Sequence, residues 1–508
     1  MPDASSTAAA PARPLRPGVV ALMLALALVA HELAYGLCVQ DDAFISFRYA
    51  ANLINGQGLV FNPGDAVEGY TNFLWTLGMA GGMALGVNPV LLSIVGGMAA
   101  SAGVALVAWR IAAVLAGPDH PWLALLAPAL LLTDTGLALE SVQGLESSFF
   151  SMLVGLGLLG AIRETEHPEA RPWSAVALAL AALTRPEGAL AFGLLFGGRL
   201  LLTRFRPGRN AWVGAGLVVG TLLAHEALRL GYYGDWVPNT FHAKVGGGLA
   251  AAQRGLAYLG GFAMSHVGLS LGLLAGAVGT LKLAKRRPAA WLPLVLLLPW
   301  LAYIVTVGGD FKGTWRFVLP LLAPMVALVP AGLAVLLGSK PRALAATAVG
   351  LLVLQGAVDL PRALPDALDR ADYRALDMEQ RLAVGHWLRQ NVPPDTLLAI
   401  HSAGTIPYAS GLPTIDLWGL SDRHIAKAPI SSMGAGTAGH EKHDYDYAFG
   451  RDPALYIPEQ GMLTSEPLRL VIPENFPADF EENYDQTSIR IDTRWLNLWH
   501  RVGWAPGR

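Results

Sequence analysis

A polar stretch with two adjacent carboxylates, residues 41–75, follows the first apolar run of this chain. It reads DDAFISFRYAANLINGQGLVFNPGDAVEGYTNFLW. A carboxylate such as Asp41 or Asp42 can orient or deprotonate an acceptor hydroxyl if burial or a neighbouring like charge raises its pKa. Ionisable groups at a membrane boundary are costly to desolvate, so they tend to persist where they bind ions, sugars or phosphates. We therefore expect at least one of the two aspartates to be catalytic, while the other could cap the helix that follows.

The same stretch offers further polar groups among aromatic side chains. Aromatic faces stack on sugar C–H groups, while amides, carboxylates and guanidinium groups bind hydroxyls. We therefore predict substrate contacts for Arg48, Glu68 and Asn72. For Trp75 we favour an anchoring role at the membrane interface, together with Tyr70.

Two more polar segments follow. TDTGLALESVQGLESS contains Asp134, Glu140 and Glu146. These carboxylates could bind a divalent cation, although their spacing matches no fixed metal loop and helix capping explains Asp134 and Glu140 equally well. In LTRPEGA, Arg185 could bind a phosphate with both guanidinium nitrogens or simply pair with Glu187. We assign Glu146, Arg185 and Glu187 to the substrate site.

Cations that could hold a phosphate occur in two later segments, YYGDWVPNTFHAKVG and GGDFKGTWRF. In both, cations stand next to aromatic residues that could contact a lipid or a sugar. A cluster of snorkelling interfacial side chains is the alternative for the second segment. The predicted substrate-binding residues here are Asp235, Asn239, His242, Lys244, Asp310 and Arg316.

The composition indicates a polytopic membrane protein. Of the 508 residues, 53% are hydrophobic and only 15% are charged, and the mean hydropathy is +0.43. The net charge of -2 gives no sign of a nucleic-acid partner. The single cysteine, Cys38, cannot form an internal disulfide and is expected to be a small apolar residue at a helix end.

About eleven apolar runs are suited to spanning a bilayer. They are residues 18–38, 88–115, 121–134, 147–162, 172–184, 188–203, 211–230, 266–284, 289–307, 317–338 and 342–358. A shorter run, 73–86, is predicted to lie along the outer interface as a helix. With that assignment the Lys- and Arg-rich joints all fall on the cytoplasmic side, and every polar motif described above falls on the outer side.

The chain is predicted to have three parts. Residues 1–17 form a disordered cytoplasmic N-terminus, and 18–358 form a transmembrane catalytic domain whose first periplasmic loop is 40–87. Residues 359–508 have ordinary globular composition and are expected to form an extracytoplasmic α/β or α+β domain. Its strand-like TLLAI, its turn-rich HSAGTIPYASG and the stretch LPTIDLWGLSD support a mixed sheet.

Several of these motifs resemble the GT-C superfamily of membrane glycosyltransferases, which use polyprenyl-phosphate sugars. They are DD at 41–42, GLVFNPGDAVEGYTNFLW, GLESS, TRPEG, GDWVPNTFHAK and GGDF with a downstream arginine. Within the superfamily the chain looks most like the bacterial, mycobacterial-type terminal β-(1→2)-arabinofuranosyltransferases. The resemblance implies a GT-C fold with juxtamembrane helices, a catalytic Asp41 or Asp42, and a cavity open to the outer leaflet with outer-loop cations around the lipid phosphate.

We therefore expect a glycosyltransferase in the bacterial inner (plasma) membrane. It would transfer a sugar, with arabinofuranose as one candidate, from a polyprenyl-phosphate donor to an envelope glycan or surface acceptor. No nucleotide is needed, and a divalent cation is left open as a cofactor. A lipid-linked sugar flippase and a glycan-binding membrane scaffold without catalysis are the alternatives.

Overall fold

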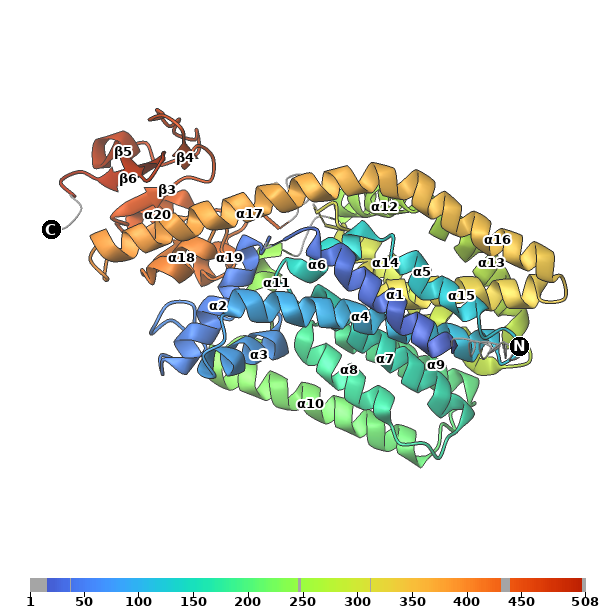
Figure 1. Ribbon diagram of the computed structural model, residues 1–508. Helices are drawn as coiled ribbons and strands as arrows, with labels where there is room; N and C mark the ends of the chain where they lie inside the picture. Colours follow the sequence, from blue (N-terminus) through green and yellow to red (C-terminus); the bar gives the residue numbers. More distant parts are fainter. Residues whose placement is uncertain (1–15, 37, 245–247, 311, 431–438, 505–508) are drawn as a thin grey trace, which may run out of the picture.

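The structure, a computed structural model, describes residues 16–36, 38–244, 248–310, 312–430 and 439–504. Residues 1–15 of the predicted disordered N-terminus lie outside the described residues. A long helical bundle makes up most of the molecule, and a smaller unit with a β-sheet lies at one end of it (Figure 1).

The bundle is built from the helices of residues 17–354. They are α1 Pro17–Leu33, α2 Asp41–Ile54, α3 Phe73–Ala84, α4 Pro89–Ala116, η1 Leu123–Leu125, α5 Leu126–Leu131, α6 Thr135–Val142, α7 Ser147–Glu166, α8 Trp173–Thr184, α9 Glu187–Leu202, α10 Arg209–Tyr233, α11 Asn239–Lys244, α12 Gly248–Ser265, α13 Val267–Ala284, η2 Pro288–Trp291, α14 Leu292–Val307, α15 Leu319–Leu337 and α16 Pro341–Leu354.

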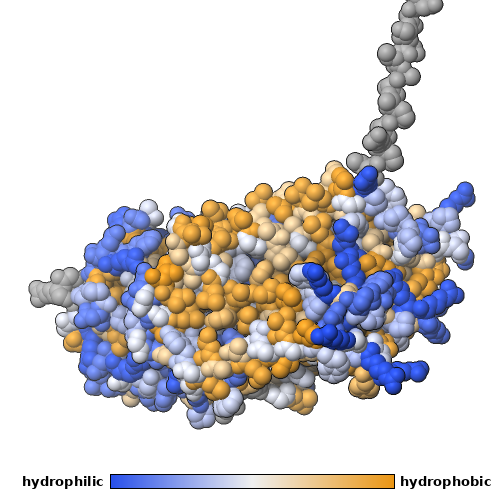
Figure 2. All heavy atoms as spheres, turned by 90° about the horizontal axis from the view of Figure 1, so that it is seen from below, coloured by the Kyte–Doolittle hydropathy of each residue, from blue (hydrophilic) through white to orange (hydrophobic). Residues whose placement is uncertain are grey.

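Each of the eleven predicted apolar runs is mainly helical; 121–134 contains the two short helices η1 and α5, and 342–358 extends beyond the end of α16. Among the described residues, seven helices are long and apolar enough to cross a membrane, or eight if the bent pair 123–131 and 135–142 counts as one span. The remaining predicted spans, on α1, α8 and α9, are helices of 12 to 17 residues. Figure 2 shows a hydrophobic band between two hydrophilic ends. The chain is a multi-pass membrane protein.

Helix α15 forms the centre of the bundle and packs on α4, α7 and α13. Close contact with α13 depends on glycine, because a Cβ on Gly279 would lie only 2.3 Å from the Cα of Gly332. This tight crossing lies in the C-terminal half of α15. The loop 308–318, which carries the predicted Asp310 and Arg316, leads into the other end of that helix.

The segments that the sequence assigned to outer loops are largely helical. Residues 40–87 form α2 and α3, and the joint after α10 contains the 18-residue α12. The expected anchoring role of Tyr70 and Trp75 at the membrane interface is wrong, because both side chains are buried. The Trp75 indole instead donates a hydrogen bond to the carbonyl of Gly144, 3.2 Å away.

The basic joints gather at the end of the bundle opposite α2 and the sheet (Figure 1). There Arg287, after α13, pairs with Glu166 at the end of α7 and donates to the carbonyl of Val114 near the end of α4. The N-terminus of α1 lies at this same end. The Lys- and Arg-rich joints therefore share one end of the bundle, as the sequence predicted.

Helix α16 continues through a π-helical turn, Gln355–Asp359, into α17, Leu360–Asn391. The three segments form one helix over Pro341–Asn391, and the domain boundary predicted at 358/359 falls inside it. Figure 1 shows this helix running along the bundle and out to the sheet.

The predicted mixed C-terminal unit is confirmed. Its sheet has the order β2-β1-β3-β6-β4, with β5 paired to β6; β1 is parallel to β2 and β3, whereas β6 is antiparallel to its partners. The strands are β1 Leu398–Ile400, β2 Thr414–Asp416, β3 Leu455–Ile457, β4 Leu463–Thr464, β5 Tyr484–Ile491 and β6 Arg494–Arg501. The helices are α18 Thr405–Ser410, α19 Arg423–Lys427, α20 Tyr445–Gly450 and α21 Phe480–Asn483. Strand β1 lies within TLLAI, and the predicted turn before β2 contains the short helix α18.

Candidate active site

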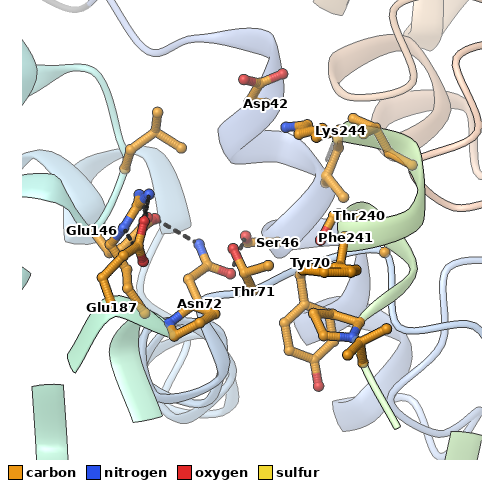
Figure 3. A pocket seen from close by; sticks show the side chains of 18 of the residues that line it. Asp42, Ser46, Tyr70, Thr71, Asn72, Glu146, Glu187, Thr240, Phe241 and Lys244 are labelled. Atoms are coloured by element: carbon orange, nitrogen blue, oxygen red, sulfur yellow. Dashed lines mark hydrogen bonds and ion pairs between the residues drawn. The ribbon is translucent and has the colours of Figure 1, made fainter. Parts of the chain in front are cut away.

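A cavity of about 710 Å³, here called the lipid cavity, opens beside the start of α2. Its walls come from α2, the segment before α3, the turn between α8 and α9, α11, and the loop before α15 (Figure 3). The predicted site residues that line it are Asp42, Asn72, Glu146, Arg185, Glu187, Lys244 and Arg316. Residues far apart in the sequence thus meet in one place.

Asp42 faces this cavity from the first turn of α2, with 41% of its side chain exposed. Its Oδ2 lies 3.4 Å from the ammonium of Lys312, which also donates to Gln40. Burial alone would raise the pKa of Asp42, but the positive charges of Lys312, Lys244 and Arg316 outweigh burial and hold that pKa below its ordinary value. Asp42 is therefore an ionised carboxylate at any working pH.

Asp41 has a different environment from its neighbour. Its carboxylate accepts hydrogen bonds from the backbone N–H groups of Gly404 (2.9 Å) and Thr405 (2.8 Å), at the start of α18. Helix α2 itself has Gln40 at its N-cap and no side-chain cap. One of the two aspartates therefore does cap a helix, but that helix belongs to the C-terminal unit. Burial raises the pKa of Asp41.

A buried polar network forms one wall of the lipid cavity. The guanidinium of Arg185 pairs with Glu146 at 2.7 Å and with Glu187 at 3.1 Å. Asn72 donates to the second oxygen of Glu146 (2.8 Å), and the hydroxyl of Tyr303 donates to Glu187 (3.4 Å). Arg185 therefore pairs with Glu187, as one reading predicted, and it also lines the cavity, while phosphate binding stays a prediction.

Two further cations lie near Asp42. Arg316 is paired with Asp310 at 2.9 Å. Lys244, at the end of α11, extends toward Asp42 in Figure 3, and in the described part of the chain it forms no ion pair. An unpaired ammonium beside an ionised carboxylate suits an anionic group that arrives with a ligand.

The rest of the lipid cavity is apolar. Its lining includes Ile45, Leu145, Leu190, Trp236, Val237, Phe241, Val307 and Phe317. Leu190 on α9 and Val307 on α14 extend these walls toward the apolar band, so the cavity joins charged groups to apolar walls. This combination suits an amphiphile with an anionic head.

The other predicted substrate residues have structural partners. Glu68 pairs with Arg229 at 2.6 Å, and Arg229 itself lines the cavity. Arg48 is buried and donates to the carbonyls of Phe61, Pro407 and Leu412.

The remaining three connect α11 to the C-terminal unit. The amide of Asn239 donates to the carbonyls of Gly419, Leu420 and Asp422. Asp235 pairs with Lys427 and with His242; burial would raise its pKa, but these two partners lower it to about 2. These contacts position Lys244 by fixing the helix that carries it.

Sequence reasoning did not assign Gln40, Arg229, Tyr303 and Lys312 to the site. Lys312 belongs to GGDFKGTWRF, the same segment as the predicted Asp310 and Arg316, so its charge next to them was the available signal.

The sequence left helix capping and cation binding open for Asp134. Asp134 caps α6 by accepting a hydrogen bond from the N–H of Leu137 (2.7 Å), and it lies 3.3 Å from His266. Among the described residues, no group of three His, Cys, Asp or Glu side chains could hold a metal ion.

Comparison with solved structures identifies the fold. ArnT from Cupriavidus metallidurans bound to undecaprenyl phosphate superposes with a TM-score of 0.58 and 13% identity, covering 96% of this chain and 98% of that one. Its apo form gives a TM-score of 0.53 at 13% identity, with 95% and 98% covered. The chain therefore has the GT-C fold of ArnT, as the sequence resemblance implied.

Comparison of sequences finds two curated relatives that carry the same name. The terminal β-(1→2)-arabinofuranosyltransferase of Mycobacterium tuberculosis is 31% identical over 357 residues, 66% of this chain and 51% of that protein. The protein of the same name from Corynebacterium glutamicum is 30% identical over 340 residues, 58% of this chain and 48% of that one. The chain thus spans about half the length of these relatives. Residues 371–499 also match a family described as a domain of unknown function (DUF8728).

Proposed function

We propose that this protein is a membrane glycosyltransferase that moves a sugar from a polyprenyl-phosphate donor to a cell-envelope glycan or surface acceptor. Arabinofuranose is the favoured sugar, because the curated relatives carry arabinofuranosyltransferase in their names. The observation that carries the proposal is the lipid cavity, where the carboxylate of Asp42 and the ammonium of Lys244, which has no ion pair among the described residues, lie together beside apolar walls.

In the proposed reaction the acceptor hydroxyl attacks the anomeric carbon of the donor sugar. A new C1–O bond forms to the acceptor, and the bond between C1 and the phosphate oxygen breaks. The electron pair of that bond leaves with the lipid phosphate, whose charge Lys244 and Arg316 stabilise. The proton of the acceptor hydroxyl passes to Asp42 and from there to solvent or to the phosphate.

The lowered pKa of Asp42 bears on its role. A carboxylate with a low pKa is a weak base, so early removal of the hydroxyl proton is unfavourable. Asp42 therefore orients the acceptor hydroxyl by accepting its hydrogen bond, and takes the proton late, when the oxygen has already begun to bond to C1. Asp41, whose oxygens are occupied by backbone N–H groups, supports the geometry instead.

The protein is proposed to lie in the bacterial plasma membrane with this site on the outer face. The support is the position of the basic joints. The Lys- and Arg-rich joints lie at one end of the bundle, and α2, α11 and the sheet lie at the other (Figure 1). A polyprenyl-phosphate donor is consistent with that face, because such a donor needs no cytosolic nucleotide.

The test is incubation of the purified full chain, in lipid nanodiscs, with a panel of polyprenyl-phosphate sugars and an envelope glycan extract. Release of lipid phosphate together with labelled product is expected for at least one pentose donor. Absence of release for every donor, in protein that remains folded, would contradict the proposal. Movement of the donor across proteoliposome membranes without sugar transfer would support a flippase instead.

A further inference from the structure

A second cavity, here called the polar cavity, also reaches Asp42 and has a volume of about 440 Å³. One side of it is formed by Gln40, Asp41, Asp42 and Lys312. The remaining walls come from α17 and from loops around the sheet, and all of those residues fall within 371–499, the segment that matches a domain of unknown function. Asp42 is thus shared by two cavities with different walls.

The polar cavity has no aliphatic side chain among the described residues that line it. It cannot offer the apolar contacts that a polyprenyl chain needs, whereas the lipid cavity can. Its volume falls in the range of about 300–1,000 Å³ that is typical of sites for small ligands. A hydroxyl-rich ligand suits such walls better than a lipid does.

The polar cavity has no excess of positive charge, because the carboxylates Asp41, Asp42, Asp377 and Glu459 stand against the cations Lys312, Arg374 and Arg381. Buried Arg381 pairs with Asp377 at 2.8 Å and with Glu459 at 3.0 Å, and the hydroxyl of Ser402 donates to the other oxygen of Glu459. Lys312 is likewise paired with Asp42. Groups of this kind offer fixed hydrogen-bond donors and acceptors without favouring an anion, so they suit a neutral ligand with several hydroxyl groups.

Two aromatic side chains complete the cavity. The half-buried indole of Trp418 lies 4.2 Å, centroid to centroid, from the ring of His440, and its backbone N–H is tied to Asp416 at 3.0 Å. Tyr373 on α17 is 62% exposed. A fixed indole and an accessible phenol ring offer apolar faces on which sugar C–H groups can stack.

We propose that the polar cavity binds the acceptor as a neutral saccharide end, and that the 371–499 segment supplies the residues that select it. This inference rests on the proposed function. With the donor head in the lipid cavity and the acceptor in the polar cavity, the acceptor hydroxyl meets the donor sugar at Asp42, the one carboxylate common to both. The C-terminal unit is thereby part of the active site rather than a separate glycan-binding module.

The experiment compares two reciprocal variants of the full chain in nanodiscs. Trp418→Ala removes an aromatic face from the polar cavity, and Trp236→Ala removes one from the lipid cavity, where Trp236 is 70% exposed. The probes are synthetic neutral oligoarabinofuranosides, with oligosaccharides ending in a uronic acid for comparison. Initial rates with the donor identified above give separate KM values for donor and acceptor.

Trp418→Ala is expected to raise the acceptor KM by about tenfold or more, the loss of about 1.4 kcal/mol of contact, and to leave the donor KM within about twofold. Trp236→Ala is expected to do the reverse. Equal effects on both KM values, no effect of Trp418→Ala, or preference for the uronic acid probes would overturn the inference. Tyr373→Ala, at an exposed position on α17, gives the same test if Trp418→Ala does not fold.

A second readout separates failure of this inference from failure of the proposed function. Saturation-transfer NMR with the oligoarabinofuranosides and no donor is expected to show binding to the parent and weaker binding to Trp418→Ala. Binding with no lipid phosphate released from any donor would contradict the transferase while supporting the saccharide site. Release of lipid phosphate with no detectable role of Trp418 or Tyr373 would contradict the saccharide site alone.

Discussion

The two cavities that share Asp42 differ in what their walls can bind. The lipid cavity combines charged groups with many apolar side chains, whereas the polar cavity is lined by charged groups of both signs and by aromatic rings, and most of its lining residues belong to α17 and the C-terminal unit. An amphiphile binds best to apolar walls, whereas a sugar needs hydrogen-bonding groups. The comparison shows how a single carboxylate can serve both substrates if each approaches from its own cavity.

The largest expected effect comes from replacing the shared carboxylate. Asp42→Asn keeps the side-chain shape but removes the charge and the proton acceptor, so we expect transfer to fall by about 10²–10⁴-fold with the melting temperature little changed. The measurement is release of lipid phosphate over time, with circular dichroism for the fold. Activity within about tenfold of the parent would exclude Asp42 as the catalytic residue.

Replacing Lys244 should affect the kinetic constants for the donor alone. Lys244→Met retains much of the apolar stem and removes the ammonium, so we expect the donor kcat/KM to fall by about 10–100-fold, the loss of one charge-assisted contact of about 1.5–3 kcal/mol. The acceptor KM should remain near the parent value. The control is Lys285→Met, which removes an exposed lysine just after α13 that lines neither cavity.

The pH profile of transfer tests the charge environment of Asp42. Since Lys312, Lys244 and Arg316 depress its pKa, Asp42 stays ionised until the pH falls below the usual aspartate range of about 3.9. Lys312→Met removes one of these charges and should move the acidic limb of kcat/KM to higher pH by about one unit. Lys340→Met, at the opposite end of the bundle, should leave the limb in place; an equal shift there would show that the effect is not local.

The smallest effect is expected for the other aspartate. Asp41→Asn can still accept one of the two backbone N–H bonds from Gly404 and Thr405, so we expect a loss of about 1 kcal/mol in stability, as for other helix caps. The C-terminal wall of the polar cavity should loosen, which raises the acceptor KM slightly and spares the donor KM. A loss of transfer activity in Asp41→Asn as large as that in Asp42→Asn would assign catalysis to both aspartates rather than to Asp42 alone.

Much of this architecture was predictable from local patterns. The apolar runs predicted the positions of the bundle helices, because a segment that must bury its backbone polar groups in lipid has few options besides a helix. The basic joints predicted which ends of the helices lie together. Charged segments such as TRPEG and GGDFKGTWRF stood out because charge is rare in so apolar a chain, and they do reach the lipid cavity through Arg185, Glu187 and Arg316.

Some predicted site residues line neither cavity, for a physical reason that the sequence does not carry. Arg48 and Asn239 have the same hydrogen-bonding groups as cavity residues, yet they bind backbone carbonyls of the C-terminal unit. The type of a side chain determines which groups it can bond, but the fold determines which of those groups lies next to it.

The sequence by itself determined a multi-helix membrane protein with a mixed C-terminal sheet, and it singled out the aspartate pair as the proposed centre of chemistry, because hydropathy and charge can be read over a few neighbouring residues. Only the tertiary structure shows that the two aspartates have different environments. Adjacent residues at the start of α2 point in different directions, so Asp41 meets the backbone of α18 while Asp42 meets Lys312 and two cavities. The polar cavity also depends on the tertiary structure, because its walls form where α17 and the C-terminal unit lie next to the start of α2.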